Sequence, residues 1–288
     1  MKIVSYNIQF GRGLDGVVDL VRTCGAIRGA DIICLQEVDQ WWERSGNTDQ
    51  ALEIGGLMPT YYTVFGSSFD VDASARSAHG AVVNRRRRHG NMILSRWPIL
   101  GMRCLNLPKR HRDDRFNMQM TCLEAVVDTG DTALRIYNCH AGYLEPVERK
   151  AQFECLAGAF AAAPAEQGAW SGKADIDGDD WSNRCRAPPM PARAVVCGDL
   201  NSTPDSAEFV KFIEATGLVD CWSLADPGNR AATTLRKSSS PEIDIAGKID
   251  HILVTPDLGE RVEAVAIDER ADGSDHKPVA AVLSLPSE

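Results

Sequence analysis

The chain has 288 residues with 44% hydrophobic and 25% charged side chains, which is the composition of an ordinary globular protein. A formal net charge of −9 argues against a protein that coats nucleic acid with its whole surface. No apolar run approaches the roughly eighteen residues of a membrane-spanning helix, and polar residues interrupt the start of the chain where a signal peptide would have its apolar core. We therefore expect a soluble, cytoplasmic protein.

The nine cysteines are scattered singly and include no C-x-x-C pair. A disulfide framework or a zinc–cysteine site needs characteristic spacings, so the sequence favours free thiols in a reducing compartment. Several of them, such as Cys34, Cys139 and Cys197, lie in apolar runs, where a free cysteine behaves as a small core residue.

Positive charge is concentrated between Arg76 and Arg115. This segment carries 11 Lys and Arg against two acidic residues, whereas the rest of the chain carries 20 against 38. A basic segment on an acidic body suits an anionic substrate that is held in one place. Two solvated loops that happen to be rich in arginine would give the same pattern, and the sequence leaves that alternative open.

Strands and helices alternate along the chain. Lys2–Ile8 alternates polar and apolar residues as a strand does, Gly16–Ile27 has the apolar spacing of a helix, and Ile32–Gln36 is a short buried strand. Two more helices are predicted over Pro146–Ala163, ending at a proline, and over Ala207–Thr216, ending at a glycine. Further strands are predicted over Tyr61–Phe65, Asn91–Leu94, Arg103–Leu107, Met118–Val127, Leu134–Cys139, Ala194–Cys197, Ile249–Val254, Val262–Ile267 and Val279–Leu283.

Two stretches are predicted to be loops. Phe69–His89 is polar and rich in arginine, and Ala165–Arg193 is rich in Gly, Asp, Ser and Pro, which indicates a mobile surface insertion. No internal repeat and no second apolar core is present, so we expect a single domain over residues 1–288. Many strands with few helices predict two β-sheets packed together with helices outside them.

Polar side chains recur where a predicted strand ends or begins. Asn7 ends the first strand, Glu37 follows Ile32–Gln36, and His140 follows Leu134–Cys139. A rigid sheet presents such side chains to a common pocket. The others are Asp199 and Asn201 after Ala194–Cys197, Asp250 near the start of Ile249–Val254, and Asp275 and His276 before Val279–Leu283.

These residue types suit the hydrolysis of a phosphoester. Mg²⁺ or Mn²⁺ takes hard oxygen ligands, typically one or two carboxylates with waters and a substrate phosphate. Asparagine holds a water or a phosphate oxygen without adding negative charge, and a carboxylate beside a histidine fixes the tautomer of its ring. The sequence has no G-x-S-x-G, Walker, G-x-G-x-x-G or H-E-x-x-H pattern, so the signatures of other chemistries are missing.

Each motif taken alone has a structural explanation. Gly198–Asn201 suits a turn, Leu35–Glu37 suits a solvated strand end, and His140 suits a core histidine with satisfied hydrogen bonds. The joint occurrence of the motifs, in this order along the chain, is what favours catalysis.

Seven segments from the first strand to the last resemble one family. That family is the endonuclease/exonuclease/phosphatase superfamily, which includes pancreatic-type deoxyribonuclease and exonuclease III-type repair enzymes. No single segment is specific, but the ordered set covers nearly the whole chain. The segments are Ile3–Ile8, Ile33–Val38, Gly90–Arg96, Asn138–His140, Gly198–Pro204, Lys248–Ile252 and Ser274–Pro278.

The resemblance implies a four-layer α/β/β/α sandwich of two packed mixed β-sheets flanked by helices, an α+β fold with its pocket at one edge of the sheets. It also implies a cofactor, Mg²⁺ or Mn²⁺. The metal would be bound chiefly by Glu37, with Asn7 and Asp275 in or near its coordination shell.

Catalytic roles are implied for the remaining residues. Asp199 would orient or deprotonate the attacking water, and Asn201 would hold the water or a phosphate oxygen. Asp250 would pair with His276, which would contact the scissile phosphate or serve as the base. His140 would contact the phosphate and protonate the leaving oxygen. The sequence leaves open which of Asp199 and His276 is the base.

Substrate contacts are expected from Asn91, by the same resemblance, and from Arg86, Arg87 and Arg88. The run Arg85–His89 departs from many relatives, which have a shorter stretch there, often with an acid. We therefore assign no second-metal carboxylate.

Three functions are consistent with these observations. The first is a phosphodiesterase acting on nucleic acid, although aromatic residues are only 7% and none interleaves with the arginine run, so no base-stacking platform is visible in the sequence. The second is a phosphoesterase for a nucleotide, an inositol phosphate or a phospholipid headgroup. The third is a catalytically silent interaction module. We expect a monomer, and for the enzyme readings a partner that is an anionic phosphate-ester substrate, with nucleic acid as one candidate.

Overall fold

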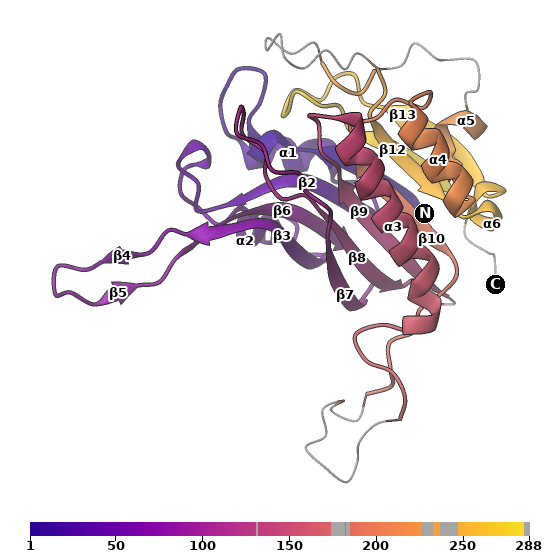
Figure 1. Cartoon of the computed structure of the whole chain (residues 1–288), viewed down its shortest axis with the longest axis horizontal. Coiled ribbons are helices and arrows are strands. Elements are labelled where there is room, and N and C mark those ends of the chain that lie inside the picture. The colour runs from indigo at the N-terminus through magenta and orange to yellow at the C-terminus, as the bar shows by residue number, and fades with distance from the viewer. Residues whose placement is uncertain (131, 174–181, 183–184, 226–232, 237–246, 285–288) are drawn as a thin grey trace.

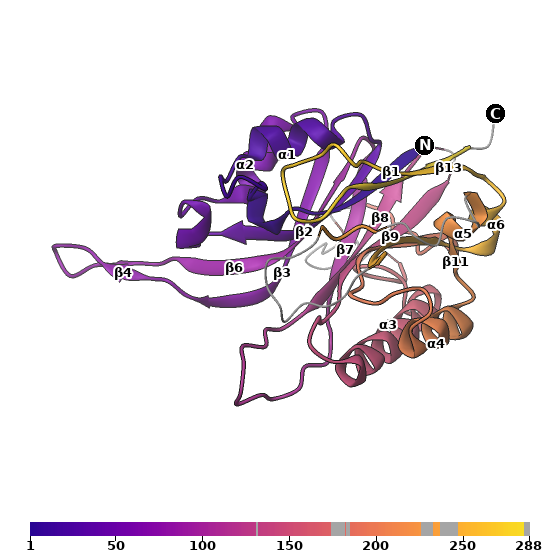
Figure 2. The same ribbon diagram turned by 90° about the horizontal axis from the view of Figure 1, so that it is seen from above.

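The structure is a computed structural model that describes residues 1–130, 132–173, 182, 185–225, 233–236 and 247–284. Two six-stranded mixed sheets pack face to face (Figure 1). Seen from above in Figure 2, helices α1 (Leu20–Ile27) and α2 (Gln50–Leu57) lie on one side of them, and α3 (Pro146–Glu166) and α4 (Ala207–Thr216) on the other. The predicted four-layer α/β/β/α sandwich is confirmed.

The first sheet has the strand order β13-β14-β1-β2-β6-β3. Its central strands β1 and β2 are parallel, and all other neighbours are antiparallel. The strands are β1 (Lys2–Asn7), β2 (Ile32–Gln40), β3 (Tyr62–Asp72), β6 (Arg86–Ser95), β13 (Val262–Ile267) and β14 (Val279–Leu283).

The second sheet has the order β11-β12-β10-β9-β8-β7, again with one parallel pair, β9 and β10, at its centre. Its strands are β7 (Ile99–Asn106), β8 (Thr121–Asp128), β9 (Ala133–His140), β10 (Ala194–Asp199), β11 (Val219–Asp220) and β12 (Asp250–Val254). The short helices of the chain are α5 (Cys221–Ala225), α6 (Pro256–Gly259) and the 3-10 turns η1 (Gln9–Gly11) and η2 (Glu43–Ser45).

The core has three apolar layers because both sheets are buried on both faces. Successive side chains of a strand point to opposite faces, so in β1 Ile3 packs between the sheets, while Val4 and Tyr6 pack under α1 and α2. Under the other pair of helices, Phe153 of α3 stacks on Phe212 of α4 with 5.1 Å between ring centroids. Cys34, Cys139 and Cys197, predicted to be core residues, are free and buried.

Helix boundaries follow local capping. The α1 helix begins at Leu20, four residues later than predicted, because the Asp19 carboxylate accepts the hydrogen bond of Arg22 N. Gly217, with φ 67°, ends α4 as predicted. The α2 helix was not predicted, since Gly55 and Gly56 weaken its helical pattern.

The α3 helix runs past Pro164 to Glu166, so the predicted end is wrong. Proline has no N–H, and the carbonyl of Phe160, four residues earlier, therefore loses its helical partner. The Arg135 side chain donates to that carbonyl at 3.3 Å instead. This substitute bond explains how the helix accommodates the proline.

The predicted loop over Phe69–His89 is wrong. Pairing between β3 and β6 continues outward to Asp72 and Arg86, and β4 (Ala75–Arg76) and β5 (Val82–Val83) extend it into a projecting arm (Figure 1). Most of the arm's outer side chains are exposed, so the alternation that marks a half-buried strand is missing from its sequence.

The predicted insertion over residues 165–193 lies partly outside the described residues, and its first two residues belong to α3. None of the helices in the described part of the chain has the length and apolarity needed to cross a bilayer.

Candidate active site

The predicted site residues meet where the ends of the central strands of both sheets come together. Asp199 at the end of β10 is paired in register with His140 of β9 on one side and with Asp250 of β12 on the other. Asn7 ends β1, and Glu37 lies in β2 of the facing sheet. The packing of the two sheets therefore assembles the site from segments far apart in the sequence.

Asp199 is the centre of the cluster. Its Oδ2 atom accepts a hydrogen bond from Asn7 Nδ2 at 3.0 Å, and it lies 3.5 Å from His140 Nε2 and 3.6 Å from His276 Nε2. Asn7 Nδ2 also donates to Glu37 Oε1 at 3.1 Å, so this amide joins the two sheets. All of these side chains except Glu37 are buried.

His276 and Asp250 form the predicted dyad. The His276 Nδ1 atom lies 2.9 Å from Asp250 Oδ2, which fixes the ring with Nε2 toward Asp199. Asp250 is fully buried, and among the described residues its Oδ1 atom has no hydrogen-bond partner. Thr234, which the sequence did not indicate, accepts from the backbone N–H groups of Ile249 and Asp250 and so holds the start of β12.

Asn201 holds the second oxygen of Asp199. Its backbone N–H donates to Asp199 Oδ1 at 3.0 Å, and its side chain donates to the carbonyl of Ala141 at 2.9 Å. A φ of 48° places Asn201 in the left-handed region, which asparagine tolerates better than most residues. The turn therefore fixes Oδ1 of Asp199, while Asn7 holds Oδ2.

Glu37 lies on a β-bulge. The pairing of β2 with β6 shifts register between Leu35 and Val38, and Glu37 has a φ of 60°, which is unfavourable for a non-glycine residue. Within the bulge, Gln36 is fully buried and donates to Asn138 of the second sheet at 2.6 Å. The bulge turns the half-buried Glu37 carboxylate toward Asn7.

Gly198 permits the close approach of β9 and β10. A Cβ atom at this position would lie 1.8 Å from the carbonyl oxygen of Cys139, and its φ is 139°. Gly198 of β10 pairs with Cys139 of β9, and the next residues along these two strands are Asp199 and His140. Glycine at 198 is thus what brings these two side chains together.

Gln9 is a site residue that the sequence analysis missed. Its backbone N–H donates to Asn7 Oδ1 at 3.0 Å, and its side chain donates to Asp275 Oδ2 at 2.9 Å. Gln9 and Phe10 both have positive φ values of 45° and 47°. Because such a turn has no sequence signature without glycine, only the structure reveals the link between Asn7 and Asp275.

Neighbouring charges control the acid–base state of the site. Burial raises the pKa of Asp199, and the charge of Asp250 raises it further, against the lowering effect of His276 and His140. Burial and the charge of Glu37 likewise raise the pKa of Asp275. Burial alone would raise the pKa of Glu37, but nearby histidines and its bond from Asn7 keep it below the ordinary value.

His276 is expected to stay protonated far above neutral pH in the metal-free protein. Burial alone would lower its pKa, but the charges of Asp250 and Asp199 raise it to about 10. A raised pKa contributes stability that is fully present below the ordinary value of about 6.5 and is lost as the pH rises through the folded value. An NMR titration of the EDTA-treated protein should show the His276 midpoint near pH 10, and Asp250→Asn should lower it. A midpoint between pH 6 and 7, close to the ordinary value, would contradict this assignment.

The predicted substrate contacts all lie on β6. Asn91 is buried, and its amide donates to the carbonyls of Thr121 and Asn138 at 3.1 and 2.9 Å. Arg86 and Arg88 both pair with Asp70 on the arm. Arg87, between them, points to the other face, where its guanidinium lies 5.5 Å from the ring centre of Trp42.

The donor set fits a divalent cation. Glu37, Asp199, Asp250 and Asp275 bring four carboxylates into one site, and like charges this close are costly unless a cation balances them. The unpartnered Oδ1 atom of Asp250 adds to that demand. Hard oxygen donors without thiolates suit Mg²⁺ or Mn²⁺. Among the described residues, the ligand atoms of Asp199, Asp250 and His276 also lie within 4.8 Å of one another.

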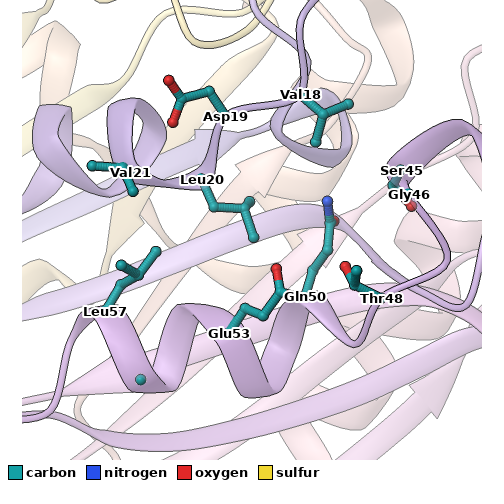
Figure 3. Close-up of a pocket in the computed structure, with 11 residues that line it drawn as sticks. Val18, Asp19, Leu20, Val21, Ser45, Gly46, Thr48, Gln50, Glu53 and Leu57 are labelled. Carbon is teal, nitrogen blue, oxygen red and sulfur yellow. The ribbon is translucent and has the colours of Figure 1, made fainter.

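A hollow of about 580 Å³ lies away from this cluster, between α1 and α2 (Figure 3). Leu20, Val21 and Leu57 line it, together with Gln50, whose amide is already bonded to Phe10 and Asp39. None of the candidate catalytic residues lines this hollow, so it is separate from the site.

The chain matches the model of the Endonuclease/Exonuclease/phosphatase family over residues 4–276. No curated protein matched its sequence. Among solved structures it is similar to an endonuclease/exonuclease/phosphatase from Beutenbergia cavernae, at 22% identity and a TM-score of 0.68, over 98% of this chain and 70% of that one.

Two further solved structures share the fold over their whole length. A 3'-5' exonuclease from Neisseria meningitidis is 18% identical with a TM-score of 0.59, covering 99% of this chain and 100% of its own. A mannosyl-6-phosphatase from Bacteroides thetaiotaomicron is 14% identical with a TM-score of 0.62, covering 99% and 100%. Because the family model spans nearly the whole sequence, the chain belongs to the endonuclease/exonuclease/phosphatase family.

Proposed function

We propose that this protein is a divalent-metal-dependent phosphodiesterase of the nuclease type. The observation that carries the proposal is the arrangement around Asp199, whose carboxylate is held by Asn7 and Asn201 and faces the imidazoles of His140 and His276. A carboxylate fixed between two amides and two histidines can position a water molecule, while the histidines balance negative charge on a phosphoryl group.

The contacts favour a division of roles. Asp199 orients the attacking water and accepts its proton, because its oxygens are fixed and its raised pKa suits a base. His276, anchored by Asp250, supplies positive charge to the phosphoryl oxygens, and His140 protonates the leaving oxygen. Asn201 holds a phosphate oxygen or the water.

Glu37, with Asn7 and Asp275, would hold Mg²⁺ or Mn²⁺. The metal would neutralise charge on the phosphoryl oxygens and help orient the substrate. Gln9 would keep Asp275 in place through its 2.9 Å bond.

A phosphomonoester is the second candidate substrate. Solved structures of this fold include a 3' phosphatase from Neisseria and the Bacteroides mannosyl-6-phosphatase, each spanning 99% of this chain. The silent interaction module is disfavoured, because none of the expected catalytic side chains is replaced.

Glu37→Gln should raise the Mg²⁺ concentration for half-maximal activity about tenfold or more, with partial recovery at high metal. The substitution keeps the size of the side chain and removes the charge that would attract the cation. The test compares rates of bis-p-nitrophenyl phosphate hydrolysis across a metal titration, and isothermal titration calorimetry measures Mg²⁺ affinity directly. Glu263→Gln, at an exposed position of β13, is the matched control.

An unchanged Mg²⁺ affinity in Glu37→Gln would show that Glu37 is not a ligand of the metal. Loss of metal binding in Asp250→Asn alone would then point to Asp199, Asp250 and His276 as the ligands.

A further inference from the structure

An aromatic–arginine patch lies beside the active site, at the base of the arm. We define it as Trp41, Trp42, Phe69 and Phe116 with Arg44, Arg85 and Arg87. Trp42 and Phe69 have ring centroids 5.5 Å apart, and Phe69 and Phe116 are 6.3 Å apart. Phe116 is 63% exposed. The rings thus form a row that runs from a half-buried tryptophan to an exposed phenylalanine.

This row was invisible in the sequence because its members come from distant segments. Trp42 follows β2, Phe69 lies in β3, and Phe116 lies in the connection between β7 and β8. The basic segment has two halves, the arginines of β6 and the arginines near residue 112. The contact of Phe69 with Phe116 brings these two halves together. The sequence shows no aromatic residue within the arginine run, and it is the fold that places rings beside it.

Guanidinium groups cover the tryptophans. Arg44 lies 4.4 Å and Arg87 5.5 Å from the ring centre of Trp42, and Arg85 lies 4.3 Å from that of Trp41. In the part of the chain that the structure describes, neither Arg85 nor Arg87 has a carboxylate within salt-bridge distance. Their charge is therefore free to bind an anion.

The patch is connected to the reacting centre through His89. The His89 Nδ1 atom lies 2.7 Å from Asp39 Oδ1, and the ring meets Trp42 edge to face at 6.5 Å. His89 is 2% exposed, and among the described residues its Nε2 atom has no hydrogen-bond partner. His89 pairs in register with Asp39, two residues beyond Glu37 on β2.

An open hollow of about 470 Å³ adjoins this point and is lined by Trp42, Glu43, Arg44 and Arg87. A ligand there would meet an aromatic ring and two guanidinium groups at once.

We propose that the aromatic–arginine patch is a subsite for an unpaired nucleotide that adjoins the scissile phosphate of a nucleic-acid strand. Its base stacks on the row of rings between Trp42 and the exposed Phe116, and its phosphate meets Arg87, because Arg44 is already paired with Asp39. The proposal rests on the proposed phosphodiesterase function and narrows its substrate to a strand with at least one unstacked base.

Other classes of ligand fit the aromatic–arginine patch less well than an unpaired nucleotide does. A choline-like headgroup prefers bare aromatic rings, but here the guanidinium groups on Trp41 and Trp42 repel a cation. An inositol phosphate would bind the arginines and gain nothing from the rings. Bases in a duplex are stacked on their neighbours, whereas an unpaired base offers its face to an aromatic side chain.

The test is binding of a fluorescein-labelled oligothymidylate of about eight nucleotides, followed by anisotropy in EDTA so that no cleavage occurs. A strand of the same length with abasic residues keeps the phosphates and removes the bases. We expect the wild type to bind the base-bearing strand about tenfold tighter than the abasic strand. Trp42→Leu should remove this preference, and Trp42→Phe, which keeps a ring, should retain most of it.

Neighbouring residues supply matched controls. Arg87→Gln should weaken binding of both strands, whereas Arg193→Gln should not, because Arg193 lies outside the patch and is paired with Asp257. Leu52→Ala, at a 74% exposed position of α2, should change nothing. Hydrolysis of bis-p-nitrophenyl phosphate should stay within about twofold in Leu52→Ala, since Leu52 lies outside both the patch and the reacting centre.

Equal binding of the two strands by the wild type, or an undiminished preference in Trp42→Leu, would overturn the proposal. So would equal binding of a blunt duplex, or binding confined to vesicles containing phosphoinositides. If no diester is hydrolysed with any metal, the proposed function fails, and the anisotropy measurement still reports on the subsite.

Discussion

His276→Ala is expected to lower kcat for diester hydrolysis by about 10³-fold. The ring is 6% exposed, is anchored to Asp250 at 2.9 Å and faces Asp199 at 3.6 Å. Replacing it with alanine removes the positively charged ring between the buried carboxylates of Asp199 and Asp250. That ring is also the group that would face the phosphoryl oxygens. Little change in KM should accompany the loss, because the contact strengthens in the transition state.

The measurement is the steady-state rate on bis-p-nitrophenyl phosphate, with far-UV circular dichroism to show that the variant is folded. His111→Ala is the control, since that side chain is 83% exposed. Added imidazole should restore part of the activity of His276→Ala. A folded variant with more than about a tenth of the wild-type kcat would remove His276 from the catalytic role.

Gly198→Ala should destabilise the fold by about 4 kcal/mol or more, which is at the extreme for a single substitution. The added Cβ would lie 1.8 Å from the Cys139 carbonyl oxygen, and the positive φ of 139° adds backbone strain. The atom in the way belongs to the backbone of β9, so relief requires the two central strands to separate. Such a movement would also part Asp199 from His140.

Urea unfolding measures this effect. Gly25→Ala in the exposed part of α1 is the matched control, because no atom lies within 4 Å of the added methyl group. It should raise stability by about 0.5–1 kcal/mol, as alanine favours helix over glycine. An unchanged urea midpoint in Gly198→Ala would show that β9 and β10 do not need the close approach.

The layers and most strands could be predicted from the sequence because the central strands are continuous apolar runs bounded by turns. Ala207–Thr216 and Val279–Leu283 have the predicted bounds. The arm could not be predicted, since its strands are held by backbone pairing with little burial of their outer side chains. The end of α3 depends on Arg135, which is remote in sequence from Pro164.

The candidate site was predictable to the extent that its residues follow strand ends. Asp199 and His140 lie together because β9 and β10 pair in register, and the packing of the two sheets brings Asn7 to Asp199. Gln9 and Thr234 were not predictable, because each acts through a local backbone turn or a loop contact. The aromatic row is built from three segments that are far apart in the sequence. None of its rings lies within the arginine run, so the sequence of that run does not indicate it.

The most direct test of the central claim is the hydrolysis of bis-p-nitrophenyl phosphate by the wild-type protein with Mg²⁺, with Mn²⁺ and with EDTA. A metal-dependent phosphodiesterase should turn the substrate over with either cation, stop in EDTA and recover when the cation is returned. Turnover that EDTA leaves unchanged, or no turnover with either cation, would contradict the assignment.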